Sequence, residues 1–599
     1  MTKAILEVVK RYWGYDALRP LQEEAIVAGI QRRDSLVVLP TGGGKSLCYQ
    51  VPPLLEKRTD VVISPLISLM KDQVDGLIAN GIPAVALHSG LSVQERRQAE
   101  DFLQSGQCRL LFLAPERVLT PWFFGQVERQ QISTFVVDEA HCVSHWGHDF
   151  RPHYRQLAEL KRHFPQSSIH AFTATATERV RVDIARQLGL EDPTVLVGRF
   201  DRPNLVYRIV PRQTLKSQVE RVVRRHEGEA VIVYCITRNE TEKLAEHLSA
   251  RGIEALAYHA GLSAGERRRR QDAFTREETN VIVATVAFGM GIDRSDVRAV
   301  IHAGMPQSIE HYQQETGRAG RDGLEAECVL FHSPADSLRW QGLLDKSVES
   351  PEWRKAAQTL LDHMRRFCAP GRCRHRVLSE YFQQPYPKAN CGACDVCLGE
   401  SEGLEDGTVP AQMVLSCVAR VGQRFGMGHV VDVLRGAETD RIRSLGHDRL
   451  STYGLMSDTP KKALTHIVFQ LIEQDLLART GDQYPTLQLT EDSLPVLRGE
   501  KPVLLAPTKA KRQKAVRTTR QEAESWDGVD RSLFDRLRAL RRSVAVERGV
   551  PPYVVFNDAS LRDMARVKPA TPEQFLRVHG VGEKKLSDYG ERFLAEIAK

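Results

Sequence analysis

The sequence predicts a multidomain protein whose larger part consists of two tandem α/β lobes, each built on a parallel sheet. Short runs rich in Val, Ile and Leu alternate with helical patterns from Ser35 onward, as is typical of strands buried on both faces of such a sheet. The segment ALHSGLS at 86–92 also recurs as AYHAGLS at 257–263, and Glu-Arg-Arg begins three residues after each copy. We interpret these copies, 171 residues apart, as a duplicated lobe with a cleft between the two halves.

The first lobe is expected at residues 1–206 and the second at 207–336. Six strand-like runs lie in the first lobe: SLVVLP, VVISP, AVALH, RLLFLAP, TFVVDEA and SIHAFTAT. Five lie in the second: VIVYCIT, ALAYHAG, NVIVATV, AVIHAG and CVLFH. The repeat offset places RLLFLA on NVIVAT, so strand falls on strand in the two copies.

Smaller modules follow the lobes. Apolar positions three and four apart predict a helical segment at 337–403 that closes with a cysteine cluster. Further helices and two short β-like runs around a Gly-Asp turn predict a winged helix at 404–506. A basic linker at 507–528 then leads to a small all-α module at 529–599.

Composition is ordinary for a globular protein, with 42% hydrophobic and 27% charged residues. The net charge of +7 is too small to prove a polyanionic partner. No run of eighteen apolar residues occurs, so no membrane span is expected, and the first residues lack a signal-peptide core. Isolated cysteines within apolar runs favour reduced core thiols and a cytoplasmic location.

A candidate phosphate-binding loop lies between the first strand and a helix. Its residues are Thr41, Gly42, Gly43, Gly44, Lys45 and Ser46. The glycines let backbone N–H groups approach phosphate, Lys45 can reach the β- and γ-phosphates, and Ser46 can ligate Mg²⁺. Leu39 stands where the full motif has its first glycine, so the loop alone is also compatible with an ordinary Gly-rich turn.

Two carboxylates emerge at the end of a later strand, Asp138 and Glu139, followed by Ala-His. Asp138 is expected to orient Mg²⁺ and Glu139 to polarise the attacking water. Two arginines of the second lobe, Arg318 and Arg321, are expected to face the cleft as arginine fingers. Considered by themselves, they could equally form surface salt bridges.

Two further groups of residues are candidates for binding. Upstream of the first lobe, Tyr15, Arg19 and Gln22 offer a ring, a guanidinium and an amide that could bind adenine; an exposed helix face is the simpler alternative. After Glu139, the residues Trp146, Phe150 and Arg151 could stack on bases and contact phosphate. Packing within the first lobe is the alternative for this second group.

TGGGKS, SPLISLMKDQ, DEAH, FTATAT, ATVAFGMGIDR and QETGRAGRDG occur in this order and resemble the motifs of superfamily 2 helicases. SHWGHDFRPHY after DEAH and WGYDALRPLQ at 13–22 resemble the RecQ family. The resemblance implies two RecA-like lobes and ATP-dependent unwinding of DNA with 3′→5′ polarity, in recombination, repair and replication-fork processing. It also implies that Thr173, Thr175, Gly291 and Asp293 line the cleft.

Three cysteines lie in a C-x-x-C-x-x-C pattern, Cys391, Cys394 and Cys397, and a fourth thiolate would complete a closed tetrahedral Zn²⁺ site. Cys373 and Cys368 compete for the fourth position, and an iron–sulfur cluster is the rival metal. The RecQ resemblance favours zinc and falls on Cys373. A role in folding is expected.

The last modules offer weaker candidates. Tyr484, at the tip of the short wing, could stack on a terminal base pair or pack on its own domain, and the short wing argues against a strand-separating wedge. The C-terminal module resembles the HRDC domain, where Tyr553, Lys584 and Lys585 could bind single strands weakly; a core role for Tyr553 is as plausible.

We expect a monomeric enzyme that uses ATP, Mg²⁺ and Zn²⁺ and acts on single-stranded and duplex DNA. Single-strand-binding protein is a candidate partner. Two alternatives remain open: an RNA helicase, and a nucleic-acid-binding scaffold whose ATPase merely switches affinity.

Overall fold

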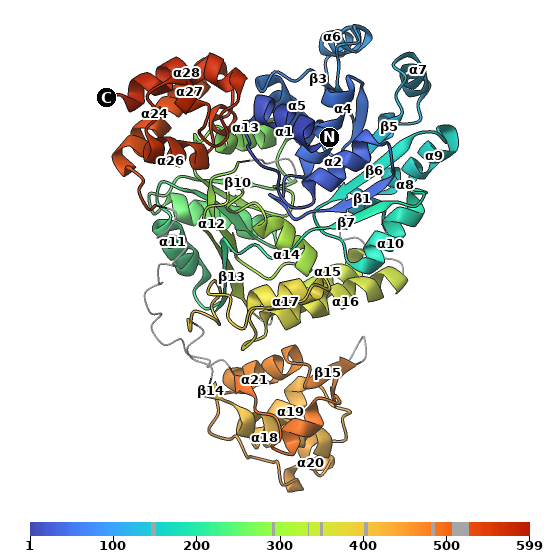
Figure 1. The fold of residues 1–599 in the computed structure, drawn as a ribbon. Helices are drawn as coiled ribbons and strands as arrows, with labels where there is room; N and C mark the ends of the chain where they lie inside the picture. Colours follow the sequence, from blue (N-terminus) through green and yellow to red (C-terminus); the bar gives the residue numbers. More distant parts are fainter. Residues whose placement is uncertain are drawn as a thin grey trace.

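Two parallel sheets form the centre of the molecule (Figure 1). The computed structural model describes residues 1–144, 151–289, 294–333, 335–347, 351–400, 405–480, 485–505 and 526–599. Within these ranges, no helix is both long and apolar enough to cross a membrane.

The first lobe contains a seven-stranded sheet in the order β3-β4-β2-β5-β6-β1-β7. Its strands are β1 (Ser35–Val38), β2 (Asp60–Ile63), β3 (Ala84–Leu87), β4 (Leu110–Leu113), β5 (Thr134–Val137), β6 (Ser168–Thr173) and β7 (Thr194–Val197). Six of the seven coincide with the predicted runs, and every pairing is parallel. The additional strand, β7, lies at the edge beside β1 and is only half-buried.

The second lobe contains a six-stranded parallel sheet in the order β10-β11-β9-β12-β13-β8. Its strands are β8 (Leu205–Pro211), β9 (Ala230–Tyr234), β10 (Ala255–Tyr258), β11 (Val281–Ala284), β12 (Val297–His302) and β13 (Ala326–His332). The strand missing from the sequence prediction, β8, is again an edge strand.

The structure confirms the internal repeat. The strand β3, the helix α6 (Val93–Gln104) and the strand β4 each have a counterpart of the same length 171 residues later, in β10, α13 (Ala264–Thr275) and β11. The N-cap serines of the two helices, Ser92 and Ser263, each accept a hydrogen bond from the backbone N–H three residues on. This is the cap that stabilises the first turn of a helix.

The predicted helical segment comprises α15 (Ala335–Ser347), α16 (Pro351–Cys368) and α17 (Arg374–Tyr381). The module after it has its own apolar core and the antiparallel hairpin of β15 (Leu477–Thr480) and β16 (Thr486–Leu489), in agreement with a winged helix. Its helices are α18 (Thr408–Arg420), α19 (Met427–Leu434), α20 (Asp440–Ser444), α21 (Lys461–Glu473) and α22 (Ser493–Leu497).

The C-terminal helices form a separate small core that packs against both lobes (Figure 1, red). They are α24 (Arg531–Arg548), α25 (Pro552–Val555), α26 (Asp558–Val567), α27 (Pro572–Phe575) and α28 (Glu583–Ile597). On the second lobe, the buried carboxylate of Glu277 accepts hydrogen bonds from Arg541 at 2.8 Å and Arg542 at 2.9 Å.

On the first lobe, this C-terminal module meets the end of α1 (Thr2–Trp13). Gly14, which ends that helix at φ +72°, lies so close to Val581 that a Cβ on Gly14 would be 2.3 Å from the Val581 carbonyl carbon. Glycine is therefore required at this position for two reasons, its backbone angle and the contact between modules.

We expect Gly14→Ala to release the C-terminal module from the first lobe, because the methyl group cannot share space with the Val581 backbone. Distance changes between dyes on α1 and α28 would report the separation. Gly549→Ala is the matched control: Gly549 also ends a helix at φ +66°, but a Cβ there has no described atom within 4 Å. Both variants pay about 1–2 kcal/mol of backbone strain, so equal dye distances in the two would refute the expectation.

Candidate functional site

The loop at 39–44 joins β1 to the helix α3 (Lys45–Gln50) at the carboxyl end of the first sheet. Gly42 and Gly44 have φ of +80° and +79°, backbone angles that residues with a Cβ rarely adopt. A Cβ on Gly42 would also lie 3.2 Å from a guanidinium nitrogen of Arg202. Both the backbone angles and the crowding explain why the sequence is Gly-rich here.

Lys45 lies beside both strand-end carboxylates. Its ammonium group donates to the Leu39 carbonyl at 3.1 Å. Burial lowers the pKa of Lys45, whereas the negative charges of Glu139 and Asp138 oppose that shift. Burial and the adjacent Glu139 raise the pKa of Asp138, and Lys45 opposes this. The two sequence motifs therefore meet in one electrostatically coupled group, as predicted from their positions at strand ends.

The same group suits a hard cation. Asp138 is 7% exposed, and a carboxylate in such a place is stabilised by added positive charge. Carboxylate and hydroxyl oxygens are the ligands that Mg²⁺ prefers in nucleotide sites. The Ser46 hydroxyl and the Asp138 carboxylate, both within reach of the Tyr49 hydroxyl, fit this requirement.

Glu139 links the site to the next motif. Its backbone has φ +50°, and its carboxylate lies 3.3 Å from Nδ1 of His141. The same ring nitrogen lies 2.9 Å from the hydroxyl of Thr173 at the end of β6. A non-glycine residue in this backbone region is strained, and such strain is concentrated at functional sites. The contact joins DEAH to FTATAT, whose Thr175 is also buried.

The two arginines of the second lobe take different positions. Arg321 lies opposite the phosphate-binding loop, since its Cα would be 3.7 Å from a Cβ on Gly42 and its charge acts on Lys45. Arg318, which was expected to face the cleft as well, is buried within its own lobe and donates to the Gly289 carbonyl. Of the two arginines, Arg321 is therefore the one that lies next to the phosphate-binding loop. Gly291 and Asp293 lie outside the described residues.

Two of the three candidates for adenine binding, Arg19 and Gln22, contact the phosphate-binding loop. Arg19 donates to the Gly42 carbonyl. The amide of Gln22 accepts from the Arg19 backbone N–H at 2.7 Å and donates to the Gly44 carbonyl at 3.0 Å. The two residues therefore brace the phosphate-binding loop in this structure, which argues against a merely exposed helix face.

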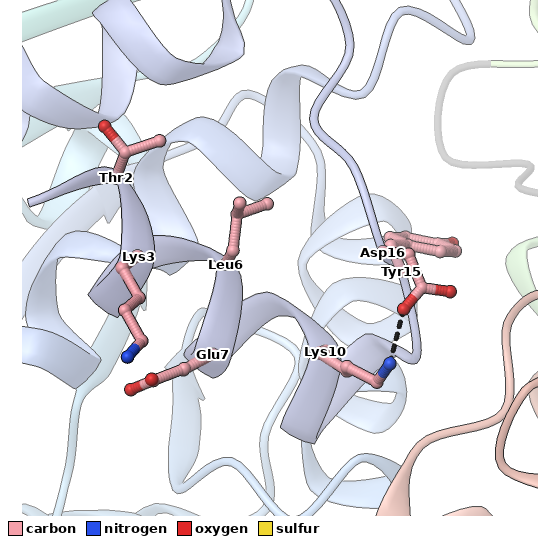
Figure 2. Close-up of a pocket in the computed structure, with 7 residues that line it drawn as sticks. All are labelled: Thr2, Lys3, Leu6, Glu7, Lys10, Tyr15 and Asp16. Carbon is pink, nitrogen blue, oxygen red and sulfur yellow. Dashed lines mark hydrogen bonds and ion pairs between the residues drawn. The ribbon is translucent and has the colours of Figure 1, made fainter.

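Tyr15 contacts the C-terminal module. Its ring stacks on His579 with centroids 5.3 Å apart, and the Gly580 N–H points to the Gly14 carbonyl at 3.4 Å. Tyr15 also lines an open hollow of about 470 Å³ beside α1, where Lys10 pairs with Asp16 (Figure 2). The ring that could receive adenine is therefore shared between the first lobe and the C-terminal module.

Both flanks of the aromatic stretch are anchored, although Trp146 and Phe150 lie outside the described residues. Before it, the Ser144 hydroxyl donates to Asp183 at 2.7 Å. After it, Arg151 donates from its guanidinium to the Pro65 carbonyl, in the SPLISL motif, at 3.0 Å. The buried Tyr154 hydroxyl then donates to the carbonyl of Asp138 at 3.1 Å. The described residue Tyr154 thus connects the C-terminal flank to the strand end that carries Asp138.

The other candidate DNA contacts are less informative. Tyr484 lies outside the described residues. Tyr553 is partly buried on α25, Lys584 pairs with Asp588 at 3.2 Å, and the ammonium of Lys585 lies 5.6 Å from the centre of the Phe556 ring. These positions leave a DNA contact by the C-terminal module as a prediction.

The cysteine cluster has the geometry of a closed metal site. The sulfurs of Cys373, Cys391, Cys394 and Cys397 all lie within 4.8 Å of one another. Backbone N–H groups of Cys391, Ala393 and Cys397 point at cluster sulfurs at 3.3–3.4 Å. Such an environment favours thiolates and fits Zn²⁺.

Cys368 is not part of the cluster. It is buried in the apolar core at the end of α16, and its sulfur is not among the four that lie within 4.8 Å of one another. The structure therefore resolves the choice of the fourth ligand in favour of Cys373.

The cluster is fastened to the edge of the second lobe's sheet. The backbone N–H of Tyr207, in β8, donates to the Ala393 carbonyl, and the backbone carbonyl of Tyr207 accepts from the Asp395 N–H. Asp395 in turn forms a two-pronged, buried ion pair with Arg374, at 2.9 and 3.0 Å. The cysteine segment thus covers an edge strand whose backbone would otherwise be open to pairing.

Two residues of the site were not singled out from the sequence. Tyr154 was quoted in the aromatic stretch but given no role, and Arg202, in the connection between the lobes, was not considered. Both side chains donate to backbone carbonyls of residues distant in sequence. Every residue has a backbone carbonyl, so the sequence contains no motif that would predict these contacts.

Comparison with protein families agrees with this architecture. Family models match in order: DEAD/DEAH box helicase at 19–183, helicase conserved C-terminal domain at 213–323, RecQ zinc-binding at 334–398, RQC domain at 402–514 and HRDC domain at 530–597. Together with the grouping of the phosphate-binding loop, DEAH and Arg321 around Lys45, they define an ATP-dependent helicase of superfamily 2.

Comparison with individual relatives shows to which family of helicases the chain belongs. The chain is 43% identical to the ATP-dependent DNA helicase RecQ of Pasteurella multocida, over 100% of this chain and 94% of the relative. Identity is 43% to that of Haemophilus influenzae, over 99% and 95%, and 38% to that of Bacillus subtilis, over 98% of each chain. The chain belongs to the RecQ family of ATP-dependent DNA helicases, and the cysteine cluster is its zinc site.

We expect Cys373→Ser to abolish stoichiometric zinc, because three thiolates cannot close the tetrahedron, and to loosen the β8 edge. Cys368→Ala, the matched control, should retain one zinc per chain and lose stability only through the small cavity, about 1 kcal/mol. Zinc would be measured by atomic absorption and the edge by hydrogen exchange of Tyr207. Loss of metal in Cys368→Ala alone, or iron in place of zinc, would contradict the assignment.

Proposed function

We propose that the protein hydrolyses ATP at the cleft between its lobes and uses the resulting lobe movements to travel 3′→5′ along single-stranded DNA and separate duplexes. The observation that carries the proposal is the meeting of Lys45, Asp138 and Glu139 of one lobe with Arg321 of the other. Such an arrangement is complete only when the lobes are together, which makes hydrolysis depend on closure.

Each residue then has a role in phosphoryl transfer. Backbone groups at Thr41–Gly44 and the Lys45 ammonium hold the phosphates, while Ser46 and Asp138 would hold Mg²⁺, which neutralises the phosphate oxygens when bound. Glu139 orients the attacking water and accepts its proton. Arg321 stabilises charge that develops on the γ-phosphate. Tyr15, Arg19 and Gln22 receive the adenine, which requires Gln22 to exchange its hydrogen bonds to the loop for bonds to the base.

Coupling to DNA is assigned to the aromatic stretch. Trp146 and Phe150 stack on bases and Arg151 contacts the backbone, a combination that suits single strands of any sequence. A movement of the stretch would shift Asp138 through the hydrogen bond from the Tyr154 hydroxyl to the Asp138 carbonyl. His141, which contacts both Glu139 and the Thr173 hydroxyl, would transmit a change at Glu139 to Thr173.

The remaining elements are assigned auxiliary roles. The winged helix, with Tyr484 on its wing, contacts duplex DNA, and the HRDC module, with Tyr553, contacts single strands weakly. We further propose that the enzyme acts as a monomer in the cytoplasm, at the nucleoid, in recombination and repair. Single-strand-binding protein is the candidate partner because the two would share a substrate.

We expect Glu139→Gln to retain ATP and DNA affinity but to lower kcat by about 10²–10⁴-fold, because the amide cannot accept the water's proton. Glu128→Gln, an exposed carboxylate on α7 (Pro121–Arg129), is the control and should match the wild type. Steady-state hydrolysis with DNA or RNA oligonucleotides, and strand displacement on forked, blunt and four-way substrates, form the test. Normal turnover in Glu139→Gln, or preferential stimulation by RNA, would reject the assignment.

We expect Trp146→Ala and Phe150→Ala to bind ATP with nearly unchanged affinity yet to lose most of the stimulation of hydrolysis by DNA. The physical reason is that the stacking surface is lost while the phosphate site is untouched. Trp122→Ala on α7 serves as the control for general loss of aromatic packing. Full DNA-stimulated turnover and unwinding in the loop variants would show that the stretch has a structural role alone.

A further inference from the structure

The two lobes are joined by the chain between β7 and β8, and this connection carries Arg202. From there, the side chain lies between the phosphate-binding loop and the turn that holds Arg318 and Arg321. Arg199, three residues earlier, is by contrast exposed.

The guanidinium of Arg202 ties the two lobes together through backbone carbonyls. One terminal nitrogen donates to the Thr41 carbonyl of the first lobe at 2.6 Å. The other donates to the carbonyls of Ala319, at 3.2 Å, and Gly320, at 2.9 Å, in the second lobe. The planar guanidinium group thus connects the phosphate-binding loop to the two residues that immediately precede Arg321.

A third contact fixes the orientation of the fork. The remaining nitrogen, Nε, donates to the Asn204 side-chain oxygen at 3.2 Å, and the Asn204 amide donates to the Gly320 and Leu324 carbonyls at 2.9 Å each. Arg202 and Asn204 therefore both donate hydrogen bonds to carbonyls of the turn at 319–324. Lysine could not do this, because its ammonium is a single point on a flexible stem.

The electrostatic surroundings also favour an anion between the lobes. All four hydrogen bonds of Arg202 go to neutral oxygens. Burial, together with the positive charges of Arg321 and Arg19, lowers the pKa of Arg202. Three guanidinium groups next to one glycine-rich loop repel one another, so an incoming polyphosphate would relieve this repulsion and draw the lobes together.

We propose that Arg202 is a positioning residue for ATP hydrolysis: it sets the turn of Arg321 at a defined distance from the phosphate-binding loop, so that the finger meets the γ-phosphate. The inference rests on the proposed ATPase function and deepens it. Arg202 acts through the backbone of Thr41 and of the 319–320 turn, and it need not touch the nucleotide. Nucleotide binding and finger placement are thereby linked through one side chain that belongs to neither motif.

The test compares a ground-state with a transition-state ligand on the full-length protein. ADP alone reports the binding of the first lobe, whereas ADP with aluminium fluoride requires Arg321 in place. We expect Arg202→Ala and Arg202→Lys to lower kcat by about 10- to 100-fold, as expected when a charge-stabilising donor is misplaced. Affinity for the aluminium fluoride complex should fall by a similar factor, with ADP affinity changed less than about 3-fold.

Arg199→Ala is the matched control and should behave as the wild type. Asn204→Ala provides a second route, because it keeps Arg202 but removes the acceptor of its Nε; it should lower kcat in the same direction by a smaller factor. Melting temperature and zinc content establish that each variant is folded. Should Arg202→Ala fail to fold, Arg202→Lys and Asn204→Ala carry the test.

Three outcomes would overturn the inference: equal loss of ADP and aluminium fluoride affinity, which would mean that Arg202 merely shapes the loop; wild-type kinetics in both Arg202 variants; or full activity in Arg202→Lys, which would mean that charge alone suffices. Failure of the wild type itself to hydrolyse ATP would instead reject the proposed function, so the two failures are distinguishable.

Discussion

The placement of Lys45 beside Asp138 and Glu139 is the interaction on which the rest of the architecture depends. Lys45 attracts both carboxylates, but the two carboxylates repel one another and together leave negative charge that favours a metal ion. Parallel strands bring these groups together because their carboxyl ends all lie at one edge of the sheet. The second lobe then contributes a positive charge, Arg321, which acts on Lys45 from across the contact between the lobes. Charged residues of both lobes therefore lie around the phosphate-binding loop.

The accessory modules attach to this core by polar contacts of different kinds. The zinc segment is joined to β8 by backbone hydrogen bonds and by the buried Arg374–Asp395 pair, which makes it a fixed extension of the second sheet. The winged helix meets the core through charged pairs, among them His332 with Glu473 at 3.2 Å and Arg366 with Asp475. The HRDC module reaches both lobes at once, through Glu277 on one and Gly14 on the other.

Much of this could be predicted from the sequence because the signals are local. The buried strands are nearly continuous Val, Ile and Leu, the duplicated ALHSGLS segment marks the repeat, and the cysteine spacing marks the metal site. The two missed strands are edge strands: β7 is half-exposed, and β8 contains Arg208, whose charge is hidden by Glu327 and Glu400. A buried arginine that is paired with carboxylates interrupts the apolar sequence pattern by which a strand is predicted, although the strand itself still forms.

The contacts that could not be predicted join residues distant in sequence through geometry alone. Arg202 binds carbonyl oxygens, which every residue possesses, and Glu277 meets Arg541 264 residues later. The divergent directions of Arg318 and Arg321 were also hidden, because spacing in a turn does not determine which side chain faces the neighbouring lobe. Residue types identify the chemistry of a site, but its partners across a cleft depend on how the lobes pack.

The contact between Tyr15, which follows α1, and His579, which precedes α28, has a consequence for how the protein is made. The ring of Tyr15 leaves the ribosome 564 residues before its stacking partner His579. At about 5–20 residues per second, the first lobe waits roughly half a minute to two minutes for that partner. During this interval the lobe must fold on its own contacts, with the ring uncovered. The nascent chain is therefore a natural state of the helicase in which the first lobe exists without its last module.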